Sequence, residues 1–149
     1  MCGAAQQLQL VEKLAKSGMM QIDEATFDYL RIEAGLPRFG HELSEDYIPL
    51  ETGLWNDVSF AKGCYIGQEI IARMESRGKL AKKLVRFSAE SPLTAGDITS
   101  NGKKAGTLTS VANAEHGSVA LGYVRTKVLD SAEAILQAGN TTLHIQTIP

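Results

Sequence analysis

The second half of the sequence restricts the fold more than any other part. Short apolar and β-branched runs follow one another from Leu80 onward, with no helical pattern between them. These runs begin with Leu80, Leu84, Val85 and Phe87 and continue over residues 105–111, 119–124, 134–136 and 143–145. Turn-forming pairs separate them, namely Asn101-Gly102, His116-Gly117 and Gly139-Asn140. Short strands at this spacing predict a small antiparallel barrel or sandwich.

The first half of the sequence has helical periodicity instead. Residues 5–17 carry apolar side chains at helical spacing and stop at Gly18, which predicts an amphipathic helix. An apolar link with some strand character follows at residues 19–22. We therefore expect helices in this half, in contrast to the strands of the second half.

A second helix is predicted over residues 24–34. Asp23 is a suitable N-cap, and Gly35 can end the helix in a left-handed conformation. The apolar residues that we expect to face inward are Phe27, Leu30 and Ile32. Pro37, Gly40 and Pro49 then impose an irregular loop.

The stretch KGCYIGQE (residues 62–69) leads into a third predicted helix, over residues 68–76, which ends at Gly78. It places Cys64 between two glycines, which can take positive φ or admit another group close to the backbone. A helix start offers free N–H groups and a positive dipole end, which favour anions and thiolates. The pattern fits a reactive thiol and also a buried structural cysteine.

Composition excludes several classes of protein. A chain of 149 residues that is 44% hydrophobic and 21% charged is an ordinary globular composition, and its net charge of −2 gives no general attraction to nucleic acid or membranes. No apolar run approaches the roughly 18–20 residues that a membrane span needs. With two cysteines and three separated histidines, we expect no metal site, and a cytoplasmic, reducing location.

Two blocks of the sequence resemble a known family. KGCYIGQE is similar to the signature of the YgfZ-type folate-binding proteins, which are relatives of the glycine-cleavage T-protein, an aminomethyltransferase. The block RIEAGLPRFGHEL (residues 31–43), followed by IPLE (residues 48–51), resembles the segment that precedes this signature. The resemblance runs from about Ala25 onward and covers only the C-terminal half of the considerably longer family members.

This resemblance implies an α+β fold with two parts. Residues 1–78 would be a helix-bearing part of the folate-binding lobes, and residues 79–149 would be a complete antiparallel β-barrel, with a domain boundary near Gly78–Lys79. Because the family forms a ring around a folate site, half of the ring would expose surface. We therefore expect a homo-oligomer or a separately encoded N-terminal half as partner, together with iron–sulfur proteins; nucleic acid and membranes are not expected.

The resemblance also assigns site residues. Glu51 matches the glutamate that binds the pterin ring, whose N–H edge suits a two-oxygen acceptor. Cys64 would be the functional thiol, and Arg73 would be the main contact of an anion site for the glutamate tail of folate or, as a minor alternative, for RNA phosphate. The further candidates for cofactor binding are Lys62, Tyr65 and Gln68. The basic residues between Arg73 and Arg86 also fit a solvated face, Gln68 a helix cap, and Tyr65 a packed aromatic side chain.

The function that the resemblance implies is that of a folate-binding accessory protein. Such a protein supports iron–sulfur cluster assembly or repair and, through it, tRNA modification, with tetrahydrofolate as cofactor, weakly bound by the isolated chain. Two other functions stay open. One is an aminomethyltransferase, against which the cysteine-containing KGCYIGQE block argues, as does the family's catalytic aspartate, which lies in the half not matched here. The other is a truncated remnant or interaction module without catalysis.

Overall fold

The computed structural model describes residues 4–131 and 134–146. The helices are α1 (Ala4–Lys16), α2 (Glu24–Glu33), the 3₁₀ turn η1 (Trp55–Asp57), α3 (Gln68–Arg77) and α4 (Thr126–Leu129). The strands are β1 (Lys82–Ala89), β2 (Gly96–Ser100), β3 (Lys103–Ala114), β4 (Gly117–Arg125), β5 (Leu136–Ala138) and β6 (Thr141–Gln146). The α+β class is therefore confirmed.

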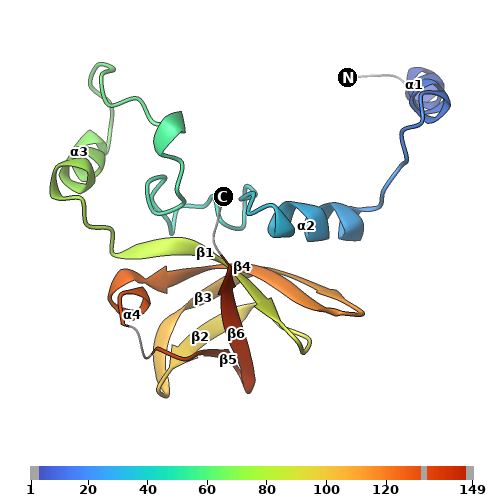
Figure 1. Cartoon of the computed structure of the whole chain (residues 1–149). Helices are drawn as coiled ribbons and strands as arrows, with labels where there is room; N and C mark the ends of the chain where they lie inside the picture. The colour runs from blue at the N-terminus through green and yellow to red at the C-terminus, as the bar shows by residue number, and fades with distance from the viewer. Residues whose placement is uncertain (1–3, 132–133, 147–149) are drawn as a thin grey trace.

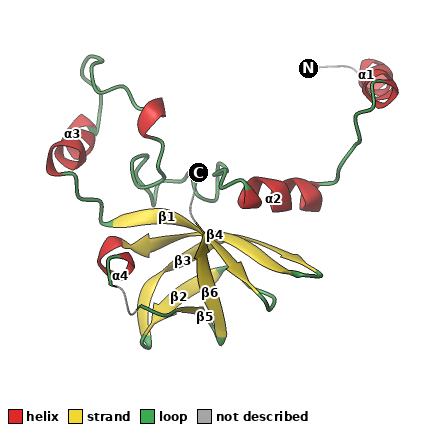
Figure 2. Cartoon of the chain, viewed as in Figure 1, coloured by secondary structure: helices red, strands yellow, loops and turns green. Residues whose placement is uncertain are grey.

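The six strands close into an antiparallel barrel in the order β1-β4-β3-β2-β5-β6 (Figure 2). Pairing of β1 with β6 completes the circle. Alternate residues of each strand point inward and fill the interior, as the two-residue period of a strand requires. The buried interior residues are Val85, Phe87, Ala89, Leu93, Ile98, Ala105, Leu108, Ala120, Val124, Leu136 and Leu143. Of the two predicted architectures, the barrel is correct.

Turn chemistry explains why these strands pair as neighbours. Asn101 and Gly102 both have positive φ, 51° and 72°, between β2 and β3, as the favoured two-residue hairpin turn requires. Gly139, with φ 58°, turns β5 into β6. Strand β2 was not predicted from the sequence, because Ile98 is its only large apolar residue. The short helix α4 was not predicted either.

The second helix begins as predicted, because the Asp23 side chain accepts a hydrogen bond from the Thr26 N–H at 2.8 Å. Its predicted inward face is partly wrong. Ile32 is buried, but Phe27 and Leu30 are each 48% exposed, and Arg31 is buried in their place. The link at residues 19–22 forms no strand, because it has no strand beside it to pair with.

The N-terminal half extends above the barrel as an open arch (Figure 1). Helix α2 packs on the outer face of β3 and β4, whereas α1 and α3 extend away on opposite sides. The contact is apolar, since Ile32 joins a buried cluster with Leu84, Leu121 and Tyr123 on the outside of the barrel. Helix α2 thus packs on the barrel although it precedes Gly78, and the division into domains at Gly78–Lys79 stays a prediction. Among the described residues, no helix has the length and apolar character of a membrane span.

Candidate functional site

The loop between α2 and η1 forms the upper surface of the barrel, and a buried ion pair fixes it there. Arg31 and Glu42 are only 5% and 0% exposed, and their side chains approach to 3.2 Å. Arg31 also donates to Asp28 at 2.6 Å and to the Ser110 hydroxyl of β3 at 2.8 Å. One guanidinium therefore joins the helix, the loop and the barrel, because its five donors point in several fixed directions.

The carboxylate of Glu42 is saturated with donors. It accepts hydrogen bonds from the Arg38 backbone N–H at 3.0 Å and from the Thr109 hydroxyl at 2.5 Å, in addition to Arg31. Burial alone would raise the pKa of Glu42, but hydrogen bonds from Ser110, Thr109 and the Arg38 backbone, with the charge of Arg31, hold it below its ordinary value. Glu42 therefore stays ionised inside the protein.

A second set of contacts fixes the later part of the loop. The Tyr123 hydroxyl donates to the Glu42 carbonyl at 2.9 Å and lies 2.7 Å from the Thr52 hydroxyl. The Tyr47 ring stacks on the Tyr123 ring, with centroids 3.6 Å apart. Leu84 of β1 donates its N–H to the Glu51 carbonyl at 2.8 Å. The loop is thus held to the barrel at several points and can present a fixed site.

Glu51 lies at the edge of a pocket above the barrel. Its side chain is 3% exposed, yet within the described residues its carboxylate has a single hydrogen bond, a long one of 3.4 Å from the Ile48 N–H. The pocket measures about 550 Å³ and is lined by the loop together with Trp55, Lys83 and Leu84. Glu51 therefore offers carboxylate lone pairs that the protein leaves largely unused.

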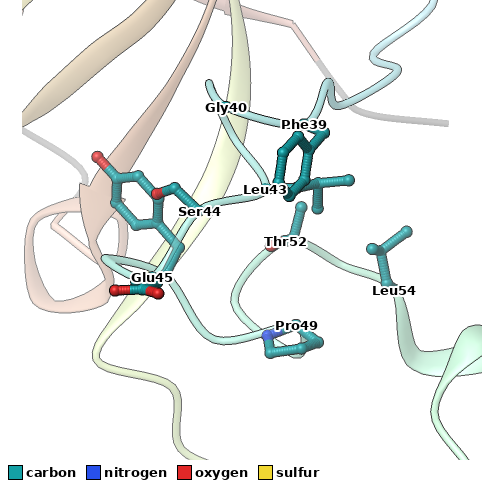
Figure 3. Close-up of a pocket in the computed structure, with 9 residues that line it drawn as sticks. Phe39, Gly40, Leu43, Ser44, Glu45, Pro49, Thr52 and Leu54 are labelled. Atoms are coloured by element: carbon teal, nitrogen blue, oxygen red, sulfur yellow. The ribbon is translucent and has the colours of Figure 1, made fainter.

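A more apolar hollow lies beside this pocket (Figure 3). Figure 3 shows that its walls come from two facing parts of the loop, residues 39–45 and 47–54. The hollow measures about 430 Å³. Thr52 and Leu54 line both spaces, so they share a wall. Phe39, which is 87% exposed, stands at its rim. The loop surface thus combines an acidic acceptor with an apolar surface.

The cysteine loop has a different environment. Cys64 is free and exposed, so the alternative of a buried structural cysteine is wrong. Lys62 places its ammonium 4.4 Å from the centre of the Tyr65 ring, and the Gln68 side chain accepts a 3.4 Å hydrogen bond from the Tyr65 N–H. Gly67, with φ 87°, turns the chain into α3, a conformation that favours glycine.

The structure brings only some of the predicted site residues together. Lys62 and Gln68 each contact Tyr65, next to Cys64 in the sequence, while Glu51 lies in the loop above the barrel. Arg73 is exposed on α3, and its described side chain forms no ion pair. Within residues 4–131 and 134–146, no group of three metal-binding side chains gathers. Whether these residues bind folate or a partner stays a prediction.

The sequence analysis assigned no role to the residues that organise the site. Arg31 and Glu42 were quoted only as letters of the block RIEAGLPRFGHEL. The block also contains Glu33 and Arg38, so charge alone did not distinguish the pair that becomes buried. Tyr123 and Thr52, which complete the network, carried no distinguishing signal either.

Known proteins share the sequence and the fold of this chain in part. The sequence model of the CAF17 C-terminal β-barrel domain matches residues 82–149. The tRNA-modifying protein YgfZ of Yersinia pestis is 33% identical over 153 aligned positions, which cover 95% of this chain and 46% of that protein. A chloroplastic protein of Arabidopsis thaliana, whose name is that of a transferase, is 32% identical over 91% of this chain and 32% of its own length.

A solved structure shares the fold over almost the whole chain. The glycine cleavage system aminomethyltransferase T from Bartonella henselae superposes with a TM-score of 0.76 at 25% identity, covering 95% of this chain and 42% of that structure. The chain is therefore similar over almost its whole length to part of YgfZ and of an aminomethyltransferase, and its residues 82–149 match the model of a C-terminal β-barrel domain. It spans about a third to a half of the length of these relatives.

Proposed function

We propose that this chain carries part of the folate site of a YgfZ-type accessory protein, which supports iron–sulfur cluster assembly or repair and, through it, tRNA modification. The observation that carries the proposal is Glu51, a buried carboxylate with nearly free lone pairs at the edge of a 550 Å³ pocket. The amino and N–H groups along one edge of a pterin can donate two parallel hydrogen bonds to such a carboxylate. Trp55 and Leu84 would contact the apolar part of the ring.

One other function has a specific observation in its favour. The similarity to an aminomethyltransferase suggests transfer of an aminomethyl group to tetrahydrofolate. Such chemistry needs an acid or base positioned beside the reacting nitrogen. Around the Glu51 pocket the other lining residue with a titratable side chain is Lys83, which is exposed. We therefore favour folate binding without aminomethyl transfer by this chain.

Titration with tetrahydrofolate tests the proposal. We expect binding weaker than about 1 μM, the affinity that corresponds to about −8 kcal/mol. A pocket normally covers about 70–90% of a ligand of this size, and the residues of this chain line only one side of the proposed site. Trp55 emission should change on binding because Trp55 lines the pocket. Micromolar or tighter binding by the monomer would contradict the expected need for further residues.

We further propose that the upper surface is covered by the part of the family fold that this sequence does not contain. Large apolar side chains are exposed along α1 and α2, among them Leu8 at 67%, Leu10 at 52% and Leu30 at 48%. The structural relative extends well beyond the region that matches this chain, so it has residues available to cover these helices.

Sedimentation velocity tests the proposed association. Monomeric proteins rarely expose apolar patches above about 400 Å² unless a partner covers them. We therefore expect the chain alone to self-associate at micromolar concentration, and to become a one-to-one complex when the N-terminal half of a relative is added. The double variant with Leu10→Lys and Leu14→Lys should reduce both self-association and binding of the added half. Lys13→Gln on the same helix should reduce neither. A stable monomer that does not bind the added half would contradict the proposal.

A further inference from the structure

A second pocket lies on the outer face of the barrel, where β1, β4 and β3 meet the loop at residues 46–47. It measures about 440 Å³ and is separate from the Glu51 pocket, with which it shares no lining residue. Its walls are predominantly polar. The residues that line it are Asp46, Tyr47, Lys82, Lys104, Gly106, Thr107, Tyr123 and Arg125.

Positive side chains outnumber negative ones around this pocket. Three lining side chains are positive and only Asp46 is negative, although the whole chain has a net charge of −2. Lys82 of β1 and Arg125 of β4 are direct cross-strand partners. Like charges at directly opposed positions repel and destabilise a sheet. Lys104 is paired with Asp97 at 2.6 Å, whereas the Arg125 side chain has no ion pair or hydrogen bond to any described residue. No described carboxylate forms an ion pair with Lys82 or Arg125, so a bound anion would offset their repulsion.

The donors in the pocket are also partly fixed in place. The Lys82 ammonium lies 4.7 Å from the centre of the Tyr47 ring and donates to the Asp46 carbonyl at 3.2 Å, which leaves two of its three protons free. Thr107 faces the pocket with a hydroxyl that has no partner among the described residues. Burial raises the pKa of Tyr123 to about 12, so its hydroxyl adds no negative charge.

We propose that this pocket binds the phosphate group of a small molecule. A phosphate dianion would neutralise the opposed charges of Lys82 and Arg125, and it would accept hydrogen bonds from the Arg125 guanidinium, the free ammonium protons and Thr107. The inference does not depend on folate binding, because the two pockets have different walls. Arg125 and Lys82 would carry the affinity, and Thr107 would orient the group.

The test uses the full chain with inorganic phosphate and with a phosphate monoester, glycerol 3-phosphate, as probes at constant ionic strength. Amide NMR shifts should saturate with either probe and should be largest near Lys82, Thr107 and Arg125. Arg125→Gln should weaken binding at least tenfold, and Thr107→Val several-fold. Lys103→Gln removes an exposed cation of β3 that does not line the pocket, and it should change the affinity for phosphate less than twofold.

Thermal unfolding gives a second readout. Phosphate should raise the unfolding midpoint of the wild-type chain clearly more than that of Arg125→Gln, since specific binding to the folded state adds stability that the variant largely lacks. Without phosphate, Arg125→Gln should be at least as stable as wild type because the repulsion is gone. Any one of four results would overturn the proposal. These are the absence of a saturable shift, equal binding by Arg125→Gln, preference for a dicarboxylate over phosphate, and binding of an RNA oligonucleotide without binding of either probe.

Discussion

Replacing Glu42 by alanine is expected to lower the free energy of unfolding by about 3–5 kcal/mol, because it removes one partner of a buried, hydrogen-bonded ion pair. Arg31 would keep Asp28 as its partner at 2.6 Å but would lose the carboxylate that lies at its buried end. Thr109 and the Arg38 N–H would lose their acceptor as well. The loop that carries Glu51 should then be held less firmly to the barrel.

Urea unfolding of the two chains measures this loss. Glu45→Ala serves as the matched control, because Glu45 is an exposed glutamate of the same loop and should change stability by no more than about 0.5 kcal/mol. The pH dependence gives a further check. Since the folded pKa of Glu42 is below the ordinary 4.5, its contribution is present at neutral pH and is lost as the pH falls below that value. A Glu42→Ala chain as stable as the control would show that the network is not structural.

The second large effect concerns function. Under the proposed function, Cys64→Ser is expected to abolish the support of iron–sulfur enzymes in a complementation assay while leaving the fold intact. The substitution is nearly isosteric, and Cys64 is exposed, so no packing depends on its sulfur. The exposure also predicts that iodoacetamide reacts with it near neutral pH. Because this chain spans less than half of the length of these relatives, the assay should be run with the N-terminal half of a relative supplied beside it.

The controls separate a functional thiol from an incidental one. Cys2 lies outside the described residues, so labelling is best measured in a Cys2→Ser background. Tyr65→Leu removes the ring that holds the Lys62 ammonium and leaves the thiol in place, and it should reduce activity less than Cys64→Ser does. Full complementation by Cys64→Ser, at the protein level of the wild type, would show that the thiol has no function.

The barrel could be predicted from sequence because its signals are local. The Asn101-Gly102 pair specifies a hairpin, and alternating apolar residues in β1 specify an inner and an outer face. Strand β2 could not be found in this way. Its single buried apolar residue, Ile98, becomes part of the interior only when β3 and β5 pair on either side.

The N-terminal half was predicted less well for a physical reason. Periodicity locates the apolar side of α2, but it does not say which side meets the barrel. In the structure, Ile32 and Arg31 face the barrel, and Phe27 and Leu30 stay about half exposed. A prediction of burial from periodicity assumes that every apolar face of a helix packs against another element. Along α2, the described residues pack against only part of the apolar face.

The site itself shows the same limit. Glu51 lies beside a pocket, but its burial did not follow from a loop position, and its role in binding the pterin stays a prediction. The contacts that hold its loop could not be predicted, because Arg31 and Ser110 are 79 residues apart in sequence and meet only in the folded chain. Spacing rules describe neighbours along a helix or strand, and this network crosses three elements.

The most direct test of the proposed folate site is a calorimetric titration of tetrahydrofolate into Glu51→Gln and Glu45→Gln side by side. Both variants lose one negative charge from the same loop, but Glu51 lies at the edge of the 550 Å³ pocket and Glu45 lines the neighbouring hollow. We expect Glu45→Gln to bind as the wild type does and Glu51→Gln to bind at least tenfold more weakly, since glutamine has one acceptor oxygen in place of two and its NH₂ group would face the donors of the pterin edge. Equal affinity of the two variants, or no binding by the wild type even when the N-terminal half of a relative is present, would contradict a folate site at Glu51.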